Sequence, residues 1–481
     1  MFWGDKIVEQ IEKVFAKKIA AGSPLIIRDE KTLSGEVHVG SLRGVAIHGL
    51  IYELLQAKGI KARYLFELND YDLFDGIPNY VDQKKYKKEL GKLLTQVPAP
   101  DGKAKNWAEY FIPNFKAAVK KTNFIPTYYR SSEVYGQGKY DKYVKAALAH
   151  KDEIRSIYKQ IADSDKEAGW LEEAVKKNGK LPWKIEWAAK FAVFGVDIEG
   201  GGKDHSTKGG SREVANAIAR EIFKIQPPFD IPYNFFVISG KKMSSSKGLG
   251  VSAFELAELL PTPILRLLLI QKQPKHELDF DPTGDTIPSL YDEYDRLAAG
   301  YFSGKKDDFA RLFELIHPKR KMVKRFLPRF SQIAYLRQMP HIDLKKEVTN
   351  MKGDKLIKED LAELKLRTDY AKLWLEKYSP DKYQLNIQTE LPESAKKFGP
   401  KIKTALARLL DYIEKQKKLD GQKLHYELHE IRKESELEPQ EFFSGLYRII
   451  LDKDSGPKAG WFLSVLDKKF LEGRLKEAIG S

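Results

Sequence analysis

Residues 25–68 read LIIRDEKTLSGEVHVGSLRGVAIHGLIYELLQAKGIKARYLFEL, and this stretch decides the fold. It opens with a short apolar run, Leu25–Ile27, that is typical of a buried strand, and a helical pattern of apolar residues follows from Leu42 to Ala57. A second run, Ala62–Leu68, predicts another strand. A strand, a helix and a strand in this order form a β-α-β unit with parallel strands and a right-handed crossover. We therefore expect a Rossmann-type parallel sheet.

The loop between the first strand and the helix carries residues that suit phosphate. It reads SGEVHVGS over residues 34–41, which puts His38 and Gly40 at a strand-to-helix turn. Helix N-termini bind phosphate, and open α/β sheets hold ligands at the carboxyl ends of their strands. Taken alone, the His-x-Gly pattern also fits a plain turn with a surface histidine.

A second short segment, KMSSSKG at residues 242–248, follows another strand candidate at residues 234–238. Its hydroxyls and lysines surround one methionine, and it ends in glycine, a composition that suits a loop closing over a triphosphate. Taken alone, it also fits a solvated loop. Because both segments follow strands and occur in this order, we interpret them as the two halves of one ATP site.

Length, composition and charge narrow the class of protein. A chain of 481 residues exceeds one ordinary domain, so two or three domains are expected, and a hydrophobic fraction of 42% can fill their cores. The formal net charge of +15 predicts attraction to a polyanion, for which nucleic acid is the natural candidate. A lysine-rich surface that only confers solubility is the alternative.

The cysteine count and the apolar runs bear on compartment and metals. The chain has no cysteine, which excludes disulfides and thiolate-bound metal such as structural zinc. Its N-terminus alternates charged and apolar residues as an amphipathic helix does, unlike a signal peptide. No apolar run approaches the roughly 20 residues that cross a bilayer. We expect a cytoplasmic protein without a membrane partner.

The pattern changes along the chain. We expect a catalytic domain at 1–260 with a mainly helical, lysine-rich insertion at about 84–180, connecting stem helices at 261–303 and an all-helical domain at 304–481. The predicted fold class is α/β, a Rossmann-type parallel-sheet catalytic domain with a helical insertion, followed by an all-α C-terminal domain. Beyond Pro263 the predicted helices are Leu265–Ile270, Ile287–Leu297, Lys306–Ile316, Leu356–Lys377, Lys401–Lys418, Leu424–Glu434 and Pro439–Leu451.

Three groups of residues resemble signatures of the class I lysyl-tRNA synthetases. They read TLSGEVHVG at 32–40, GKDHSTKGGS at 202–211 and KMSSSKG at 242–248. The first and third are similar to the HIGH and KMSKS signatures of class I aminoacyl-tRNA synthetases. The resemblance covers about Pro24 to Arg296 and is only general over the helical C-terminus, so an anticodon-binding role for that domain is what the resemblance implies.

Two positions depart from the family pattern. Leu33 stands where the family has proline, and Ser41 stands where the wider class has its second histidine. A hydroxyl still donates a hydrogen bond to a phosphate oxygen, so we expect altered nucleotide affinity with activity kept.

The resemblance implies a nucleotide site built from both signatures. Amino-acid activation is attack by a carboxylate on the α-phosphorus of ATP, which needs positioning and positive charge more than a protein nucleophile. Catalytic roles are implied for His38, Lys242 and Lys247. ATP, with Mg²⁺, is expected to contact Gly35, His38, Gly40, Ser41, Gly202, Asp204, Lys242, Met243, Ser244, Ser245, Ser246 and Lys247.

The resemblance also implies a pocket for L-lysine. Lysine has an aliphatic stem and an ammonium head, so aromatic faces and an acceptor are expected around it. The implied pocket residues are Thr32, Phe74, Trp183, His205 and Tyr233. Glu30 and Asp70 are the acidic candidates, although Glu30 stands where the family usually has a small residue.

The expected partners are tRNA(Lys), L-lysine and ATP, and we expect a monomer. Lysines and arginines of the insertion and of the C-terminal domain are expected to follow tRNA phosphates; they are Lys84, Lys85, Lys87, Lys88, Lys319, Arg320, Lys321, Lys324 and Arg325. Two other hypotheses stay open: a synthetase-like ligase for another amino acid, such as glutamate, or another acceptor, and a non-catalytic RNA-binding relative. The retained His38, Lys242 and Lys247 favour an enzyme.

Overall fold

The computed structural model describes residues 1–163, 169–238, 241–242, 252–318, 322–339 and 342–480. The chain forms two compact units. Unit 1 contains Met1–Asp281 and Arg296–Met322, and unit 2 contains Pro282–Asp295 and Val323–Ser481. Among the described residues, no helix combines the length and the apolar character that crossing a bilayer requires.

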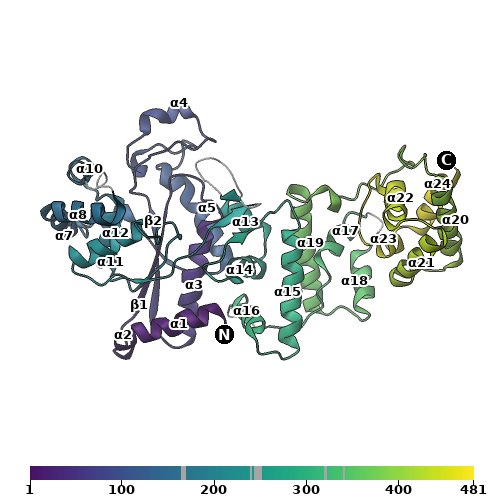
Figure 1. The fold of residues 1–481 in the computed structure, drawn as a ribbon, viewed down its shortest axis with the longest axis horizontal. Helices are drawn as coiled ribbons and strands as arrows, with labels where there is room; N and C mark the ends of the chain where they lie inside the picture. The colour runs from purple at the N-terminus through teal and green to yellow at the C-terminus, as the bar shows by residue number, and fades with distance from the viewer. Residues whose placement is uncertain (164–168, 239–240, 243–251, 319–321, 340–341, 481) are drawn as a thin grey trace. The chain divides into compact units, whose positions relative to one another are not determined.

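Unit 1 is built on a five-stranded sheet in the order β3-β2-β1-β4-β5. Every neighbouring pair of its strands is parallel, and β1 pairs with β2 from Leu25↔Ala62 to Thr32↔Asn69. The predicted β-α-β unit and Rossmann-like parallel sheet are therefore confirmed (Figure 1). The strands are β1 Leu25–Thr32, β2 Ala62–Asn69, β3 Thr127–Arg130, β4 Ile198–Glu199 and β5 Phe229–Asp230.

Helices cover both faces of this sheet. Asp29 Oδ2 in β1 lies 3.1 Å from Nδ1 of His48 in α3 (Ser41–Ala57). The next residue, Glu30, accepts a hydrogen bond from Nζ of Lys190 in α11 (Trp183–Phe194) at 2.8 Å. Because neighbouring side chains of a strand point to opposite faces, α3 and α11 lie on opposite faces of the sheet. Coverage on both faces explains why the first part of β1 is an unbroken buried run.

The order of the strands reverses at β1. The chain passes from β1 to β2 on one side, and it later returns to place β4 on the other side of β1. In open α/β sheets, such a reversal leaves a crevice at the carboxyl ends of the two strands, and ligands bind there. The structure thus predicts a site beyond Thr32 and Glu199, the last residues of β1 and β4.

The region at 84–180 is not wholly separate from the sheet. It contains several helices, as expected, but it also contains β3, which pairs with β2 from Leu65↔Thr127 to Leu68↔Arg130. This strand was not predicted, because four residues between helices carry almost no periodicity. The remaining helices of unit 1 are α1 Trp3–Val14, α2 Ala16–Ala20, α4 Gln83–Tyr86, α5 Trp107–Thr122, α6 Ser131–Gly136, α7 Asp141–Ala149, α8 Lys151–Ala162, α10 Leu171–Asn178, α12 Ser211–Glu221, α13 Ala253–Leu259, α14 Thr262–Ile270 and α16 Asp308–Leu315.

A small second sheet in unit 1 has the order β7-β6-β8. Strand β6 (Phe236–Ile238) pairs antiparallel with β7 (Lys241–Lys242) and parallel with β8 (Leu278–Asp279). Strand β6 lies within the strand that was predicted at 234–238, before the second signature, and it has a paired strand on each side.

Unit 2 is helical throughout its described residues and confirms the all-α prediction. Its core is a cluster of buried aliphatic and aromatic side chains between Met339 and Ala478. Predicted helices appear as α19, α20, α21 and α22, whereas α17, α18, α23 and α24 were not predicted. The helices are α15 Thr286–Phe302, which runs from unit 2 into unit 1, α17 Phe330–Leu336, α18 Leu344–Lys352, α19 Lys358–Lys377, α20 Pro400–Lys415, α21 Gly421–Glu434, α22 Pro439–Leu451, α23 Ala459–Val465 and α24 Lys468–Gly480.

The units do not meet at the boundary that was expected near residues 303–304. Helix α16 belongs to unit 1. Its Arg311 donates to Asp5 of α1, with Nη2 to Oδ1 at 3.0 Å, and the backbone carbonyl of Leu315 accepts from Arg266 Nη2 at 2.7 Å. These contacts tie the region just after residue 304 to the catalytic unit.

Candidate active site

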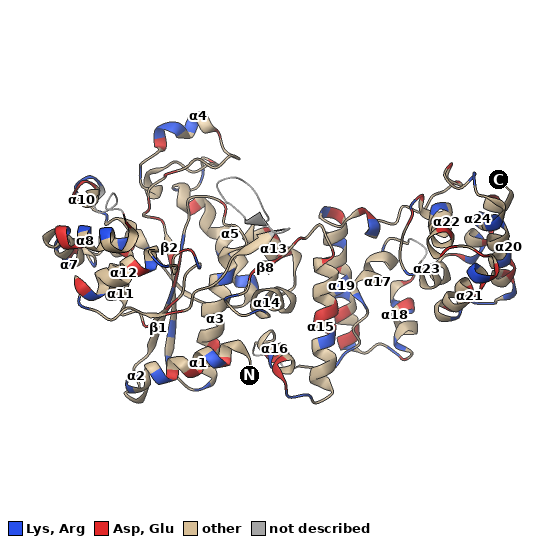
Figure 2. Cartoon of the chain, viewed as in Figure 1, with Lys and Arg blue, Asp and Glu red and all other residues tan. Residues whose placement is uncertain are grey.

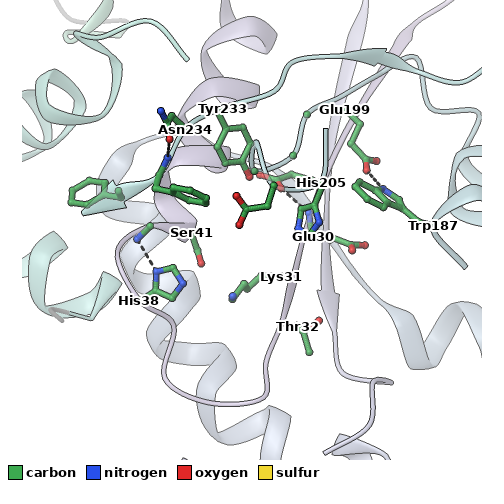
Figure 3. A pocket seen from close by; sticks show the side chains of 18 of the residues that line it. Glu30, Lys31, Thr32, His38, Ser41, Trp187, Glu199, His205, Tyr233 and Asn234 are labelled. Carbon is green, nitrogen blue, oxygen red and sulfur yellow. Dashed lines mark hydrogen bonds between the residues drawn. The ribbon is translucent and has the colours of Figure 1, made fainter. Parts of the chain in front are cut away.

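A cavity of about 370 Å³ lies at the carboxyl ends of β1 and β4, where the sheet topology predicts a site (Figure 3). It brings together residues from three distant parts of the sequence. Its lining is Asp29, Glu30, Lys31, Thr32, His38, Gly40, Ser41, Trp183, Trp187, Glu199, Gly200, Gly201, Gly202, Asp204, His205, Tyr233, Asn234, Phe235 and Phe236. Nine of the predicted ligand residues outside the second signature therefore share this cavity: Thr32, His38, Gly40, Ser41, Trp183, Gly202, Asp204, His205 and Tyr233.

One side of the cavity is the turn at the start of α3. Nδ1 of His38 accepts a hydrogen bond from the backbone N–H of Gly40 at 3.1 Å, and α3 begins at Ser41. A Cβ on Gly40 would lie 2.7 Å from the His38 ring, so only glycine lets the ring fold back over this turn. The arrangement leaves the positive end of the helix dipole facing the cavity, which favours an anion there.

The described residues beside the second signature reach the same turn. Lys242 pairs with Val237 through its backbone, and Ser252 forms an isolated antiparallel bridge with His38. The N–H of Ala253 also donates to the carbonyl of Val37 at 2.8 Å. Met243, Ser244, Ser245, Ser246 and Lys247 lie outside the described residues, so their predicted contacts stay predictions.

The opposite side of the cavity is an aromatic wall. Trp183 and Trp187 stack with their ring centroids 5.8 Å apart, and the ring of His205 meets each of them edge-on at 5.7 Å. Gly200 lets the next segment approach, because a Cβ there would lie 2.2 Å from the carbonyl oxygen of Ile231. Such a wall offers flat apolar faces to an aliphatic stem.

Tyr233 and Thr32 complete the lining among the predicted amino-acid residues. Burial raises the pKa of the Tyr233 phenol, so this hydroxyl stays neutral. The Thr32 hydroxyl donates to Oδ2 of Asp72 at 3.2 Å, which fixes its side chain at the end of β1.

Two predicted residues do not line the cavity. Phe74 is fully buried, and its ring packs 4.6 Å from Trp107 and 6.2 Å from Tyr86. It is a core residue outside the cavity lining, so the predicted contact with the amino acid is not supported. Gly35 lies against the 78–80 segment, where a Cβ would meet the Tyr80 hydroxyl at 2.8 Å. Its glycine is needed for this packing, and the predicted contact with ATP is not supported.

Beneath the cavity lies a network of buried charges. Arg28 is fully buried and forms ion pairs with Glu30, Glu67 (2.6 Å) and Glu199 (2.8 Å). Lys190, which is 2% exposed, pairs with Glu30 at 2.8 Å and with Glu67 at 2.7 Å. Buried charges are tolerated when they are paired and hydrogen-bonded, as these are.

Electrostatics keep this network ionised. Burial alone would raise the pKa of Glu67, but the charges of Lys190 and Arg28 outweigh burial and hold that pKa well below its ordinary value. Glu30 follows the same pattern, with its pKa lowered by Lys190 and Arg28 against the effect of burial. Two carboxylates and two cations therefore stay charged at neutral pH.

His48 does not line the cavity but contacts three segments that do or that adjoin it: α3, β1 and the turn at Gly200. Its Nδ1 lies 2.9 Å from the Gly44 carbonyl and 3.1 Å from Asp29, and its Nε2 accepts the N–H of Gly200 at 2.8 Å. Burial acts to lower the pKa of His48, but Asp29 outweighs it and raises the pKa. The contacts fix Nδ1 as the protonated nitrogen and link α3, β1 and the glycine-rich turn.

Several cavity residues were missed by the sequence analysis. Lys31 is the clearest case: it is partly buried, it lines the cavity and burial lowers its pKa, although nearby Asp29 acts in the other direction. Its position two residues after Asp29 on an alternating strand is the signal that places both on the α3 face. Trp187 and Glu199 were not predicted to have a role, and residues 234–236 were predicted only as part of a strand.

The part of the chain that the structure describes contains no group of three acidic or histidine side chains that could hold a metal ion.

Comparison with known proteins gives a consistent family. The model for tRNA synthetases class I (K) matches residues 1–175 and 171–319. "Lysine--tRNA ligase 1" of Methanosarcina acetivorans is 29% identical over 99% of this chain and 98% of its own length. "Lysine--tRNA ligase" of Methanocaldococcus jannaschii is 30% identical over 98% of each chain, and that of Pyrococcus furiosus is 29% identical over 98% of this chain and 99% of its own.

Among solved structures, a glutamate–tRNA synthetase from Elizabethkingia anophelis aligns with a TM-score of 0.42 at 12% identity, covering 95% of this chain and 100% of that chain. The family model spans well over half of the sequence. The chain therefore belongs to the class I tRNA synthetase (K) family and is a ligase of that family.

Proposed function

We propose that this chain activates L-lysine with ATP to form lysyl-adenylate and then transfers the lysyl group to tRNA(Lys), releasing AMP and pyrophosphate. The observation that carries the proposal is the single cavity in which an anion-binding helix start faces an aromatic wall with carboxylates at its base. The names of the similar proteins, "Lysine--tRNA ligase", support the same substrate.

In the proposed first step, a lysine carboxylate oxygen attacks the α-phosphorus of ATP, and the bond to the bridging oxygen of pyrophosphate breaks. His38 and the N–H groups at the start of α3 stabilise charge on the phosphate oxygens, and the Ser41 hydroxyl donates to them. Lys242 and Lys247 neutralise the departing pyrophosphate, which Mg²⁺ accompanies. The aromatic wall holds the substrate's aliphatic stem so that its carboxylate faces the phosphate.

In the proposed second step, a terminal ribose hydroxyl of the tRNA attacks the acyl carbon of the adenylate, and AMP leaves. Exposed lysines of the insertion, Lys84, Lys85, Lys87 and Lys88, are suited to tRNA phosphates, and Figure 2 shows basic residues on α4. Of the predicted basic residues in the C-terminal region, Arg325 pairs with Glu363 at 3.3 Å, and 319–321 lie outside the described residues. We assign the anticodon to unit 2 because it carries no nucleotide signature.

Pyrophosphate exchange with each of the twenty amino acids, with and without tRNA, tests this proposal. Lysine should support exchange and glutamate should not. The variant His38→Asn should lower the exchange rate by about a hundredfold, since it removes one phosphate contact. Exchange with glutamate alone would overturn the proposal, and equal rates for His38→Asn and the parent would overturn the role of the first signature.

A further inference from the structure

Glu30 differs from every other carboxylate of the buried charge network. Its side chain is 33% exposed, whereas the side chains of Glu67 and Glu199 are 0% and 3% exposed. Glu30 also lines the cavity. Figure 3 shows it on the side of His205, with His38 and Ser41 across the cavity. Glu199 also lines the cavity, so Glu30 is distinguished from it by its greater exposure.

The two cations that hold Glu30 leave half of its carboxylate unused. Arg28 Nη2 and Lys190 Nζ both donate to Oε2. Within the part of the chain that the structure describes, Oε1 accepts no hydrogen bond. Since the pKa of Glu30 is lowered by Lys190 and Arg28 against burial, Oε1 is an ionised acceptor held in a fixed position.

Three other carboxylates near the buried charge network are already engaged by protein groups. Asp29 is engaged by His48 and by the N–H of Glu30, and Glu199 is engaged by Arg28 and by the Trp187 indole. Asp70, the rival acidic candidate, accepts from the N–H and the hydroxyl of Ser132 and does not line the cavity. Its predicted alternative role is thus not supported.

The aromatic wall adds the second requirement of a cationic amino acid. Trp187 both belongs to that wall and donates to Glu199, which shares Arg28 with Glu30. Flat apolar faces and a carboxylate at the base of one cavity match an aliphatic stem that ends in an ammonium group.

We propose that Oε1 of Glu30 accepts the side-chain ammonium of the substrate and so determines the choice of a cationic amino acid. This inference rests on the proposed function. Arg28 and Lys190 act as positioning residues, because they fix the carboxylate before the substrate arrives and so lower the entropy cost of binding. Arg28 and Lys190 also neutralise much of the negative charge of Glu30. Selection of the substrate therefore depends on the hydrogen bond between its ammonium group and Oε1 more than on net charge. An acceptor of this kind rejects an analogue that lacks the donor, since the acceptor is then left buried and unpaired.

The first experiment compares Glu30→Gln with the parent in lysine-dependent pyrophosphate exchange, using the full chain. The amide keeps the size of the side chain and removes its charge. We expect the KM for lysine to rise by about tenfold to a hundredfold, the value of one charge-assisted hydrogen bond. The KM for ATP should stay within about twofold, since the phosphate side of the cavity is unchanged.

Asp70→Asn is the matched control, because it neutralises the rival carboxylate outside the cavity. It should leave the ratio of the lysine KM to the ATP KM within about twofold of the parent. Glu30→Asp keeps the charge and shortens the reach, so its lysine KM should fall between those of the parent and Glu30→Gln. A larger rise in the lysine KM for Asp70→Asn than for Glu30→Gln would overturn the assignment of Glu30.

A measurement on the parent protein covers the case in which Glu30→Gln does not fold. Norleucine has the stem of lysine without the ammonium, so calorimetric titration of the full chain should show norleucine binding at least about tenfold more weakly than lysine. Equal binding of the two would overturn the inference. If the parent neither binds nor activates lysine, the proposed function fails instead; if it activates lysine and Glu30→Gln keeps the parent KM, only the role of Glu30 fails.

Discussion

The base of the cavity in unit 1 and the hydrophobic cluster of unit 2 bury different kinds of side chain. Beneath the cavity of unit 1, Arg28 and Lys190 lie among carboxylates that are almost fully removed from water. The core of unit 2 between Met339 and Ala478 consists of aliphatic and aromatic side chains. A buried charge costs free energy unless its partners are well placed, whereas an apolar core gains free energy from burial itself. The charges beneath the cavity therefore depend on close partners, whereas the side chains of the unit 2 cluster gain free energy by packing alone.

The largest expected effect breaks the network in unit 1. Arg28→Met leaves Glu30, Glu67 and Glu199 buried without their shared cation, which should cost about 3–5 kcal/mol of stability. Urea denaturation of the full chain, followed by tryptophan fluorescence, measures the shift. The control Arg408→Met removes an exposed pair with Glu434 in unit 2 and should cost less than about 1 kcal/mol. Similar losses in both variants would contradict the contrast between the units.

A cavity in the core of unit 2 should separate stability from activation. Leu409 is fully buried, so Leu409→Ala should cost about 3 kcal/mol. Because no residue of the site lies in unit 2, the KM for lysine in pyrophosphate exchange should stay at the parent value while the protein is folded. Thermal denaturation and exchange kinetics on the same sample check both statements. A rise in the lysine KM would show that the apolar core also shapes the site.

Acid should weaken the stabilising contribution of the buried charge network, whereas the apolar core contains no group that it protonates. The pKa of Glu67 is lowered on folding, because Lys190 and Arg28 outweigh burial. Its stabilising contribution is therefore complete above the unfolded pKa of about 4.3 and is lost as pH falls toward the lowered folded pKa. The urea midpoint of the parent should decline below about pH 4, and Glu67→Gln should show a shallower decline. Parallel pH profiles for the two proteins would argue against this source of stability.

The smallest expected effect is a gain in stability. Burial lowers the pKa of Lys31, so its ammonium is disfavoured in the folded state, and Lys31→Met should stabilise the ligand-free protein by about 1 kcal/mol or less. The sign follows from a folded pKa below the unfolded one. The cost of the charge is present at neutral pH and disappears above about pH 10.4, where the unfolded lysine is also neutral. Melting temperatures at pH 7 and pH 10.5 should show a difference between variant and parent that shrinks at the higher pH.

The sequence predicted the parts of the fold that carry strong periodicity. The β-α-β unit at 25–68 and the helix at 439–451 appear as predicted. Short elements were not predicted. For example, β3 has only four residues and is a strand because it pairs with β2, which no local pattern indicates. The expected boundary near residue 304 differs from the observed units because α16 is recruited by Asp5, a contact across about three hundred residues that no local pattern reveals.

The site was predicted where the chemistry is local. His38, Gly40 and Ser41 belong to one turn, so their meeting follows from the strand and helix around them. Phe74 lies outside the cavity lining, and the sequence could not show this because an aromatic residue near a signature can equally face a ligand or pack in the core, here on Trp107. The exposed oxygen of Glu30 could not be predicted, since it depends on where Arg28 and Lys190 lie in three dimensions.

The contacts of α1 also set the order in which the protein can mature during synthesis. Trp3 Nε1 donates to the carbonyl of Ile270, and Asp5 pairs with Arg311. Both partners are made long after the first helix has left the ribosome, and residues 282–295 of unit 2 are made before Arg311. Such distant pairings close late. Gly4 of α1 also lies against Leu50 and Leu54 of α3, so α1 can pack on α3 early, and only its contacts with Ile270 and Arg311 wait for the later part of the chain.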